Sequence, residues 1–320
     1  MFLNRTSAEN EYSFRRRRSK PMIYSKETTM KKLIAITLLL AISLSANAGV
    51  PSFPVTPEWT AKIEKLAPEK PTAEPVAKRK ALLFSLMTGF KHWVTPHTAE
   101  VVKVLGEKSG AFEVLVSDDP EMFSPENIKQ FNLIILNNNC SNGKYRDLFR
   151  DATGDVQKAA MLEKSLIDHI AAGNGLVAIH GSIVMQNNSA AFSEMLGGSF
   201  DYHPAQRELT CTLVDPKHPL VAAFEGEPLV HTDEPYFFNN AYKDKNFRPL
   251  LEMDTSTMDA KSQSDKRYVA WIKKHGAGRV FYCSPSHNAQ SFENPKLLRF
   301  LLDGIQYAAG DLPCEDSPLK

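Results

Sequence analysis

The stretch Asn174–Ser182, NGLVAIHGS, decides how the chain is predicted to fold. Its apolar run 176–179 lies between two glycines, which is typical of a short strand buried on both faces. His180 is the first polar side chain after the run, and Gly181-Ser182 predicts a turn into a helix over about 185–196. This strand–turn–helix pattern is that of a nucleophile elbow, which places one side chain at the carboxyl edge of a parallel sheet, where open α/β folds bind ligands. A core histidine satisfied by one backbone hydrogen bond is the alternative interpretation.

Apolar runs and helical patterns alternate on the N-terminal side of this stretch. Strands are predicted at 81–86, 112–116 and 133–136, and helices at 95–106, from Ser124-Pro125 onward, and at 161–172. Strands and helices that alternate with short connections predict a parallel, doubly wound α/β sheet. On the C-terminal side, 208–214 alternates as a strand, 268–272 and 278–283 predict an added β-hairpin region, and a last helix is predicted from Pro295 to Ala309.

The first 48 residues predict a leader rather than part of the fold. Met30-Lys31-Lys32, an apolar run 33–44 and Ala46-Asn47-Ala48 match a secretory signal peptide over 30–48. The run is too short for a stable membrane span, so we expect a periplasmic or secreted protein cleaved near Ala48. Residues 1–29 are then a non-native upstream extension; the alternative is a basic arm that binds nucleic acid, because Arg15 to Arg18 are consecutive.

Removing this leader changes the charge of the chain. Residues 1–48 hold nine Lys and Arg and three Asp and Glu, a net charge of +6, whereas the whole chain carries +1, so the remainder carries −5. A mildly acidic protein is a poor nucleic-acid binder. We expect a Pro-rich extended tether over 49–78 with one short helix at 59–66, a single domain over 79–311, and a C-terminal tail over 312–320.

The four cysteines do not predict a metal or redox site. They are Cys140, Cys211, Cys283 and Cys314, and no two of them form a CxxC pair. A thiolate zinc site is therefore disfavoured. Cys211 and Cys283 lie in apolar runs and are expected to be buried free thiols, while a disulfide cannot be paired from sequence.

Polar side chains follow several predicted strands or lie in the adjoining loops. The set comprises His92, Asn139, His180, His203, Asp233, Glu234 and His287. The carboxyl ends of parallel strands meet at one edge, so these groups predict either a general acid/base site or a metal site.

Roles within this set are assigned by residue type. The candidate catalytic residues are His180, Glu234, His287 and His203, and the candidate metal ligands are His180, His203 and His287. His92, Asn139, Ser182, Asp233 and Tyr236 are the predicted substrate-binding residues. For Glu234, a loop tip paired with Lys or Arg is the alternative.

No nucleophile signature is complete. The elbow carries His180 where a cysteine or serine nucleophile would stand, and the pattern is not G-x-S-x-G. Acyl transfer through a covalent intermediate is therefore disfavoured, and Cys-dependent amidotransferase chemistry with it.

Several short motifs occur in the order seen in ThuA-like proteins, the trehalose-utilisation family. They are Gly89–His92, Gly175–Gly181, Gly197–Phe200 with His203-Pro204, His218-Pro219, Asp233–Tyr236, Val269–Trp271, Gly278–Tyr282, and Phe292 with Asn294-Pro295. The resemblance covers about residues 79–311. It implies a flavodoxin-like, class I glutamine amidotransferase-like fold with histidine in place of the catalytic cysteine. It also implies a site at His180 that is joined by His92, His203, Glu234 and His287.

The resemblance implies carbohydrate utilisation beside NAD-linked sugar oxidoreductases, with oxidised (3-keto) glycosides as substrates. A 3-keto group acidifies the neighbouring C–H, so a base could remove that proton and expel the glycosidic oxygen. The expected protein is thus an enzyme of hydrolase, lyase or isomerase type, with a divalent metal as an optional cofactor. A non-catalytic periplasmic sugar-binding protein is the alternative. For an enzyme, we expect His180 to project into a cleft shared with Glu234 and at least one more histidine.

Overall fold

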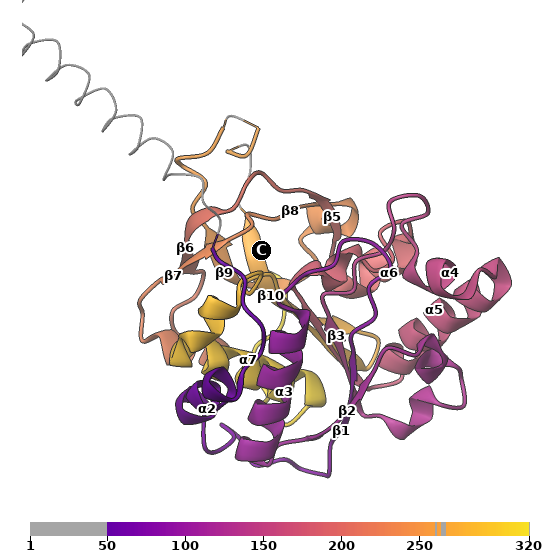
Figure 1. The fold of residues 1–320 in the computed structure, drawn as a ribbon, viewed down its shortest axis with the longest axis horizontal. Helices are drawn as coiled ribbons and strands as arrows, with labels where there is room; N and C mark the ends of the chain where they lie inside the picture. The colour runs from indigo at the N-terminus through magenta and orange to yellow at the C-terminus, as the bar shows by residue number, and fades with distance from the viewer. Residues whose placement is uncertain (1–49, 260, 264–266, 320) are drawn as a thin grey trace, which may run out of the picture. The chain divides into compact units, whose positions relative to one another are not determined.

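A nine-stranded mixed sheet runs through the fold (Figure 1). The computed structural model describes residues 50–259, 261–263 and 267–319. The strand order is β2-β1-β3-β4-β11-β10-β9-β6-β7, and a separate two-stranded sheet pairs β5 with β8. The predicted upstream extension 1–29 and signal peptide 30–48 lie outside the described residues.

The first five strands of the sheet are parallel: four were predicted as parallel strands, and the fifth, β11, is one strand of the predicted hairpin. They are β2 (Glu113–Ser117), β1 (Lys80–Phe84), β3 (Leu133–Asn137), β4 (Gly175–Ile179) and β11 (Gly278–Cys283). Every residue of β3 and β4 is buried, because the strands lie in the middle of the sheet and carry almost only apolar side chains.

The other four strands are antiparallel and extend the predicted hairpin. They are β10 (Tyr268–His275), β9 (Arg248–Met253), β6 (Arg207–Leu213) and β7 (Leu229–Asp233). The small sheet consists of β5 (Ser199–Tyr202) and β8 (Phe237–Asn239). The added region is thus larger than one hairpin, and it contributes nearly half of the main sheet.

Helices cover both faces of the parallel half. Figure 1 shows α2 (Pro57–Leu66), α3 (Thr95–Ser109) and α7 (Pro295–Ala309) on one side, and α4 (Leu148–Thr153), α5 (Val156–Ala171) and α6 (Ala190–Leu196) on the other. Two buried apolar clusters correspond to these two layers, because successive side chains of each strand point to opposite faces. Asn294 caps the start of α7, and Gly310 ends it in the left-handed conformation.

Strand directions bring four strand ends to one edge of the sheet. β1, β4 and β11 are parallel, and four successive antiparallel pairings, from β11 through β10, β9 and β6 to β7, make β7 run the same way as β11. The residues after these four strands therefore share the carboxyl edge. His92, His180, His287 and Glu234 all follow one of them.

The prediction that residues 49–78 form an extended tether is wrong for the part that the structure describes. Residues 50–78 are not an extended linker in this structure. The short predicted helix is present as α2, and its Trp59 and Ile63 are buried in the core. Thr72 donates to Asp303 of α7 at 2.5 Å, and Val76 N donates to Asp311 at 3.1 Å. The proline content of this segment is a local signal, and it did not predict the contacts that the segment makes with the rest of the fold.

Two predicted helices also differ from the structure. Residues 185–196 do not form one helix: a 3-10 turn spans His180–Val184, and α6 begins only at Ala190, because the Ser189 side chain caps it by accepting from Phe192 N. No α-helix begins at Ser124. Instead, short 3-10 turns occupy Pro120–Phe123 and Ile128–Gln130, the first of them capped by Asp119.

The structure also describes the C-terminal tail and the four cysteines. The predicted tail is packed rather than free, since Tyr307 Oη donates to Asp316 at 2.9 Å and the Glu315 carbonyl lies 2.9 Å from His218 Nε2. All four cysteines are free, and Cys211 and Cys283 are buried as expected. Within the described residues, no helix combines the length and apolar character needed to cross a membrane.

Candidate functional site: a histidine–carboxylate cluster

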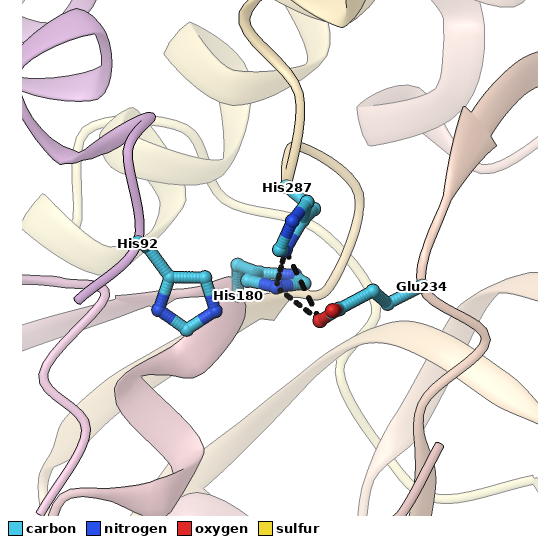
Figure 2. A group of neighbouring side chains, drawn as sticks. All are labelled: His92, His180, Glu234 and His287. Carbon is cyan, nitrogen blue, oxygen red and sulfur yellow. Dashed lines mark hydrogen bonds and ion pairs between the residues drawn. The ribbon is translucent and has the colours of Figure 1, made fainter. Parts of the chain in front are cut away.

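Four side chains meet at the carboxyl edge of the sheet. They are His92, His180, Glu234 and His287, which we call the histidine–carboxylate cluster (Figure 2). Figure 2 shows the ring of His287 and the carboxylate of Glu234 directed at His180, with His92 beside them. One potential ligand atom from each residue lies within 4.8 Å of those from the other three. Residues separated by up to 195 positions in the chain thus form one polar group.

The closest three atoms of the cluster form a small triangle. His180 Nε2 lies 3.1 Å from His287 Nδ1 and 3.4 Å from Glu234 Oε2. His287 Nδ1 lies 3.1 Å from the same Glu234 oxygen. The contacts to Glu234 lack hydrogen-bond geometry, so Oε2 is buried without a hydrogen bond.

Strand register fixes the tautomer of His180. Cys283 pairs with Ile179 across β11 and β4, so Ser284 and His180 are the next residues on neighbouring strands. The Ser284 carbonyl, which can only accept, lies 2.7 Å from His180 Nδ1. The proton of the neutral ring is therefore on Nδ1, and its free lone pair is on Nε2, which faces the triangle.

The backbone at this strand end has the expected elbow geometry. His180 has φ +48°, in the left-handed region that residues other than glycine seldom adopt. Asn138, after β3, has φ +56°, and Ser286, before His287, has φ +119°. Such conformations cost energy and concentrate at functional sites. The strand and the sharp turn predicted for Asn174–Ser182 thus match the local backbone, whereas a 3-10 turn takes the place of the start of the predicted helix.

Burial and neighbouring charge act in opposite directions on the titratable groups. Burial alone would raise the pKa of Glu234, but its contacts with His180 and His287 outweigh burial and hold that pKa well below its usual range. Burial opposes protonation of His180, yet Glu234 and Asp233 outweigh it and raise the pKa of that ring. For His92, burial followed by repulsion from His180 and His287 lowers the pKa to about 2. The cluster therefore stabilises a carboxylate and keeps His92 neutral.

Asp233, a predicted substrate-binding residue, accepts hydrogen bonds from the backbone around the cluster. Its carboxylate accepts from Ser286 N at 2.7 Å, from Glu234 N at 2.8 Å and from His287 N at 3.2 Å. His231 Nδ1 lies 3.3 Å from the same carboxylate. Asp233 is 1% exposed. It joins the ends of β7 and β11, although three strands separate them in the sheet.

His203 lies at the solvent side of the site. Its Nε2 is 3.7 Å from Glu234 Oε1, and its side chain is 35% exposed, compared with 9% for Glu234. The ring stacks on Tyr236 at 5.5 Å, and Tyr236 in turn lies 4.4 Å from the His180 ring. His203 therefore belongs to the same site but not to the buried cluster.

The other predicted substrate-binding residues are engaged within the protein. Asn139 donates to the carbonyls of Phe84 and Leu86, and it accepts from Ser182 at 3.3 Å. Asn139 and Ser182 have no exposed surface, and Tyr236 is 2% exposed. In this conformation these side chains support the strand ends.

Within residues 50–259, 261–263 and 267–319, the cluster is enclosed and does not line the expected open cleft. His180 has no exposed surface, and His92 and His287 are each 3% exposed. A pocket lined by Asp233 and Glu234 holds only about 10 Å³, the space of a single water. A pocket of about 720 Å³ lies elsewhere, between α3 and β2. The structure brings the predicted groups together but encloses them.

Several residues that shape the cluster were not predicted. The Ser284 carbonyl acts through its backbone, and Cys140 lies behind His92, with Sγ 3.6 Å from His92 Nδ1 and 3.5 Å from the Gly181 carbonyl. A Cβ on Gly181 would lie 2.7 Å from His92 Cε1. The motif Gly175–Gly181 contained this glycine, but its spatial requirement appears only in the fold.

The fold and site define the class of protein: a flavodoxin-like α/β protein whose elbow position carries a histidine instead of a nucleophile. A family model described as ThuA, trehalose utilisation, matches residues 80–308. The chain belongs to this ThuA family of carbohydrate utilisation, as the motif resemblance predicted.

Solved structures support the same fold. A ThuA-like protein from Bacteroides uniformis is similar with a TM-score of 0.57 and 17% identity, covering 73% of this chain and 92% of the other. A ThuA-like protein from Parabacteroides merdae has a TM-score of 0.53 and 18% identity, covering 75% and 93%. No curated protein matches the sequence.

Proposed function

We propose that the protein is an enzyme that acts on oxidised (3-keto) glycosides at the histidine–carboxylate cluster. The observation that carries the proposal is the convergence of three imidazoles, His180, His287 and His203, on the single carboxylate of Glu234. Membership of a family described by trehalose utilisation supports a glycoside as the substrate class.

The proposed chemistry needs one base and one acid. A carbonyl at C3 of the sugar acidifies the C2–H bond, and a base can remove that proton to form an enolate. The electrons of the enolate then expel the glycosidic oxygen from C1, and an acid protonates the leaving oxygen. Fixed positive charge near the carbonyl oxygen would stabilise the enolate.

The positions of the side chains favour particular roles. Glu234 Oε1 faces His203 at 3.7 Å, whereas Oε2 faces the buried rings of His180 and His287. We assign Glu234 as the base and His203 as the acid, because these two groups lie nearest solvent. Its contacts with His180 and His287 lower the pKa of Glu234, and an acidified C–H such as that of a 3-keto sugar suits a carboxylate base of this kind.

Substrate entry requires rearrangement of the loops over the cluster. Phe90 is 62% exposed, and its ring packs edge-on against His92 at 4.8 Å. His203, 3.7 Å from Glu234 on the solvent side, lies in the loop that leads into β6. Loops that close over a site exclude water from the reaction, which is a common role of such segments.

The proposal is tested by turnover of a 3-keto-disaccharide, followed by chromatography of the released sugar. Glu234→Gln should lower kcat by about 10²- to 10⁴-fold, since it removes the base with little change of volume. His203→Asn should lower it also, while His218→Asn, a histidine outside the site, serves as the matched control. Equal turnover by the parent and Glu234→Gln would refute the assignment.

A sugar-binding protein without catalysis is the second candidate. A pocket of about 560 Å³ near the small sheet is lined by Asp201, Tyr202 and Asn239 together with basic side chains, a composition suited to sugar hydroxyls. This candidate predicts calorimetric binding of an unmodified disaccharide and no product. The enzyme predicts binding and turnover only of the keto form.

We also propose that the protein acts after export and downstream of an oxidation. The leader predicted over 30–48 supports a periplasmic or secreted location, and N-terminal sequencing of the protein from the producing cell would test cleavage near Ala48. A 3-keto glycoside must be supplied by a sugar oxidoreductase. Loss of that activity should remove the substrate.

A further inference from the structure

The triangle of ligand atoms in the cluster has the dimensions of a metal coordination site. Its edges, between His180 Nε2, His287 Nδ1 and Glu234 Oε2, are 3.1, 3.1 and 3.4 Å. Ligand atoms at 2.0 to 2.1 Å from a tetrahedral zinc ion lie about 3.3 Å apart. The protein therefore holds three ligand atoms at nearly the separations that an ion would impose.

We propose that the histidine–carboxylate cluster binds one divalent first-row transition ion of the Zn²⁺ type. The primary ligands are His180 Nε2, His287 Nδ1 and Glu234 Oε2, and His92 supplies the fourth group. Three imidazoles and one carboxylate suit zinc and its neighbours in the first transition row, whereas calcium and magnesium prefer all-oxygen sites.

The hydrogen bonds around the cluster orient lone pairs inward. The Ser284 carbonyl holds the proton of His180 on Nδ1 and so directs the Nε2 lone pair at the triangle. Cys140 donates to the Gly181 carbonyl, which leaves its sulfur as an acceptor for His92 Nδ1 and favours a free lone pair on His92 Nε2. Without an ion, the two rings at 3.1 Å must share a proton, carried either by His287 Nδ1 or by a protonated His180.

Glu234 provides the independent observation that points to a cation. Its Oε2 is buried and has no hydrogen bond. Among the described residues, the ion pairs of Glu234 are with His180, His203 and His287 and with no lysine or arginine. A buried carboxylate oxygen without a hydrogen bond is costly unless a charge compensates it, and a divalent ion placed in the triangle does so.

Supporting groups hold the ligands in place, as in known metal sites. Asp233 binds the backbone N–H groups of Glu234, Ser286 and His287, so two of the ligands are fixed by one buried carboxylate. His92 lies farthest from the other ligand atoms. Its separation from the others reaches up to 4.8 Å, so its ring must shift by on the order of 1 Å to complete a tetrahedron.

The use of the ion in chemistry rests on the proposed function, but its binding does not. At this position, a divalent ion supplies charge for the carbonyl oxygen of a keto sugar. Binding is therefore measured without any sugar. A metal site without turnover would refute the function alone, and turnover that survives a chelator, with no ion bound, would refute the metal site alone.

The experiment strips the purified full-length protein with a chelator and titrates it with Zn²⁺ against a chromophoric competitor. Co²⁺ serves as a second probe, because its visible absorption is intense in tetrahedral sites. We expect about one ion per chain and a tetrahedral Co²⁺ spectrum. His287→Asn and Glu234→Gln should weaken binding by more than the 10- to 100-fold typical of a supporting partner, and Asp233→Asn by about that factor.

Matched variants keep the result interpretable. His218→Asn changes an equally buried histidine, 4% exposed against 3% for His287, and preserves a side chain able to cap Pro219–Phe224. It should bind Zn²⁺ as the parent does, and His92→Ala should lose less affinity than His287→Asn. Circular dichroism verifies that each variant is folded. Absence of stoichiometric Zn²⁺ binding by the parent, or equal binding by folded His287→Asn and His218→Asn, would overturn the proposal.

Discussion

Two buried carboxyl groups, Glu234 at the carboxyl edge of the sheet and Asp303 on α7, have pKa values shifted in opposite directions. Both lie at junctions between distant segments, and they are 9% and 2% exposed. Burial raises the pKa of Asp303 to about 6, because the Thr72 hydroxyl and Arg299 oppose burial only in part. The imidazoles around Glu234 outweigh burial and lower its pKa instead. Burial alone therefore does not identify a functional carboxylate. What distinguishes Glu234 from Asp303 is the group of imidazole rings around it.

The difference separates a structural junction from a candidate site. Thr72 donates to Asp303 at 2.5 Å and Gln306 accepts from Thr72 N at 2.7 Å, which ties the N-terminal segment to α7. At the sheet edge, Glu234 keeps a negative charge that no described lysine or arginine pairs with in an ion pair. The imidazoles of His180 and His287 favour the charged form of Glu234, and a carboxyl group with such a shifted pKa is typical of active sites.

The largest expected effect comes from removing the support beneath Glu234. Asp233→Ala leaves the N–H groups of Glu234, Ser286 and His287 without their acceptor. The free energy of unfolding should fall by about 3 to 5 kcal/mol, because each unsatisfied buried donor costs about 1 to 3 kcal/mol. Urea unfolding measures it. Asp233→Asn retains one acceptor oxygen and should lose less; a loss below about 1 kcal/mol for Asp233→Ala would show that the two strand ends do not depend on this carboxylate.

The second prediction concerns Asp303, where substitution should raise the free energy of unfolding instead of lowering it. Asp303→Asn should stabilise the protein above pH 6, because the folded state disfavours the charged carboxyl. In the unfolded chain this group ionises near its usual pKa of 3.8, and in the folded state near a pKa of about 6. The parent should therefore lose stability relative to Asp303→Asn as the pH rises from 3.8 to 6, by at most about 3 kcal/mol.

Chemical unfolding of both proteins at several pH values checks this prediction. Below pH 3.8 the carboxyl is neutral in both states, so the stability difference should be smallest there. Above pH 6 it should be constant. A difference independent of pH would mean that Asp303 is not held as a neutral group.

The third and smallest effect concerns the approach of His92 to the elbow. Gly181→Ala would place a Cβ 2.7 Å from His92 Cε1 and 2.9 Å from Cys140 Sγ. We expect a loss of about 1 to 3 kcal/mol, as for other overpacked sites. Gly143→Ala is the matched control, since no heavy atom lies within 4 Å of its Cβ. Thermal melting that shows equal stability for the two variants would contradict the tight packing of His92.

Much of the parallel half could be predicted from sequence. The runs at 81–86, 133–136 and 176–179 are apolar and short, and this pattern predicted buried strands that the structure contains. The elbow at His180 was predicted from the same pattern. These features are local, because each depends on residues within one strand and its turn.

The errors arose where distant contacts decide the structure. Proline content predicted a tether, but Trp59 and Ile63, one helical turn apart, bury α2 in the core. For residues 185–196, the helix starts late because Ser189 provides a cap. Glu234 could be identified as a polar group after a strand. Its partners, the supporting role of Asp233 and the Ser284 carbonyl depend on how the antiparallel half brings β7 back to β11, which no local pattern describes.

The central claim is that His180 and its partners form one functional site, and turnover of a 3-keto-disaccharide by His180→Ala tests it most directly. Circular dichroism and thermal melting must first show that the variant is folded. The account predicts a loss in kcat/KM of about 10²-fold or more, because the variant lacks the ring that contacts both Glu234 and His287. A folded His180→Ala protein that turns over the keto-disaccharide as fast as the parent would contradict it.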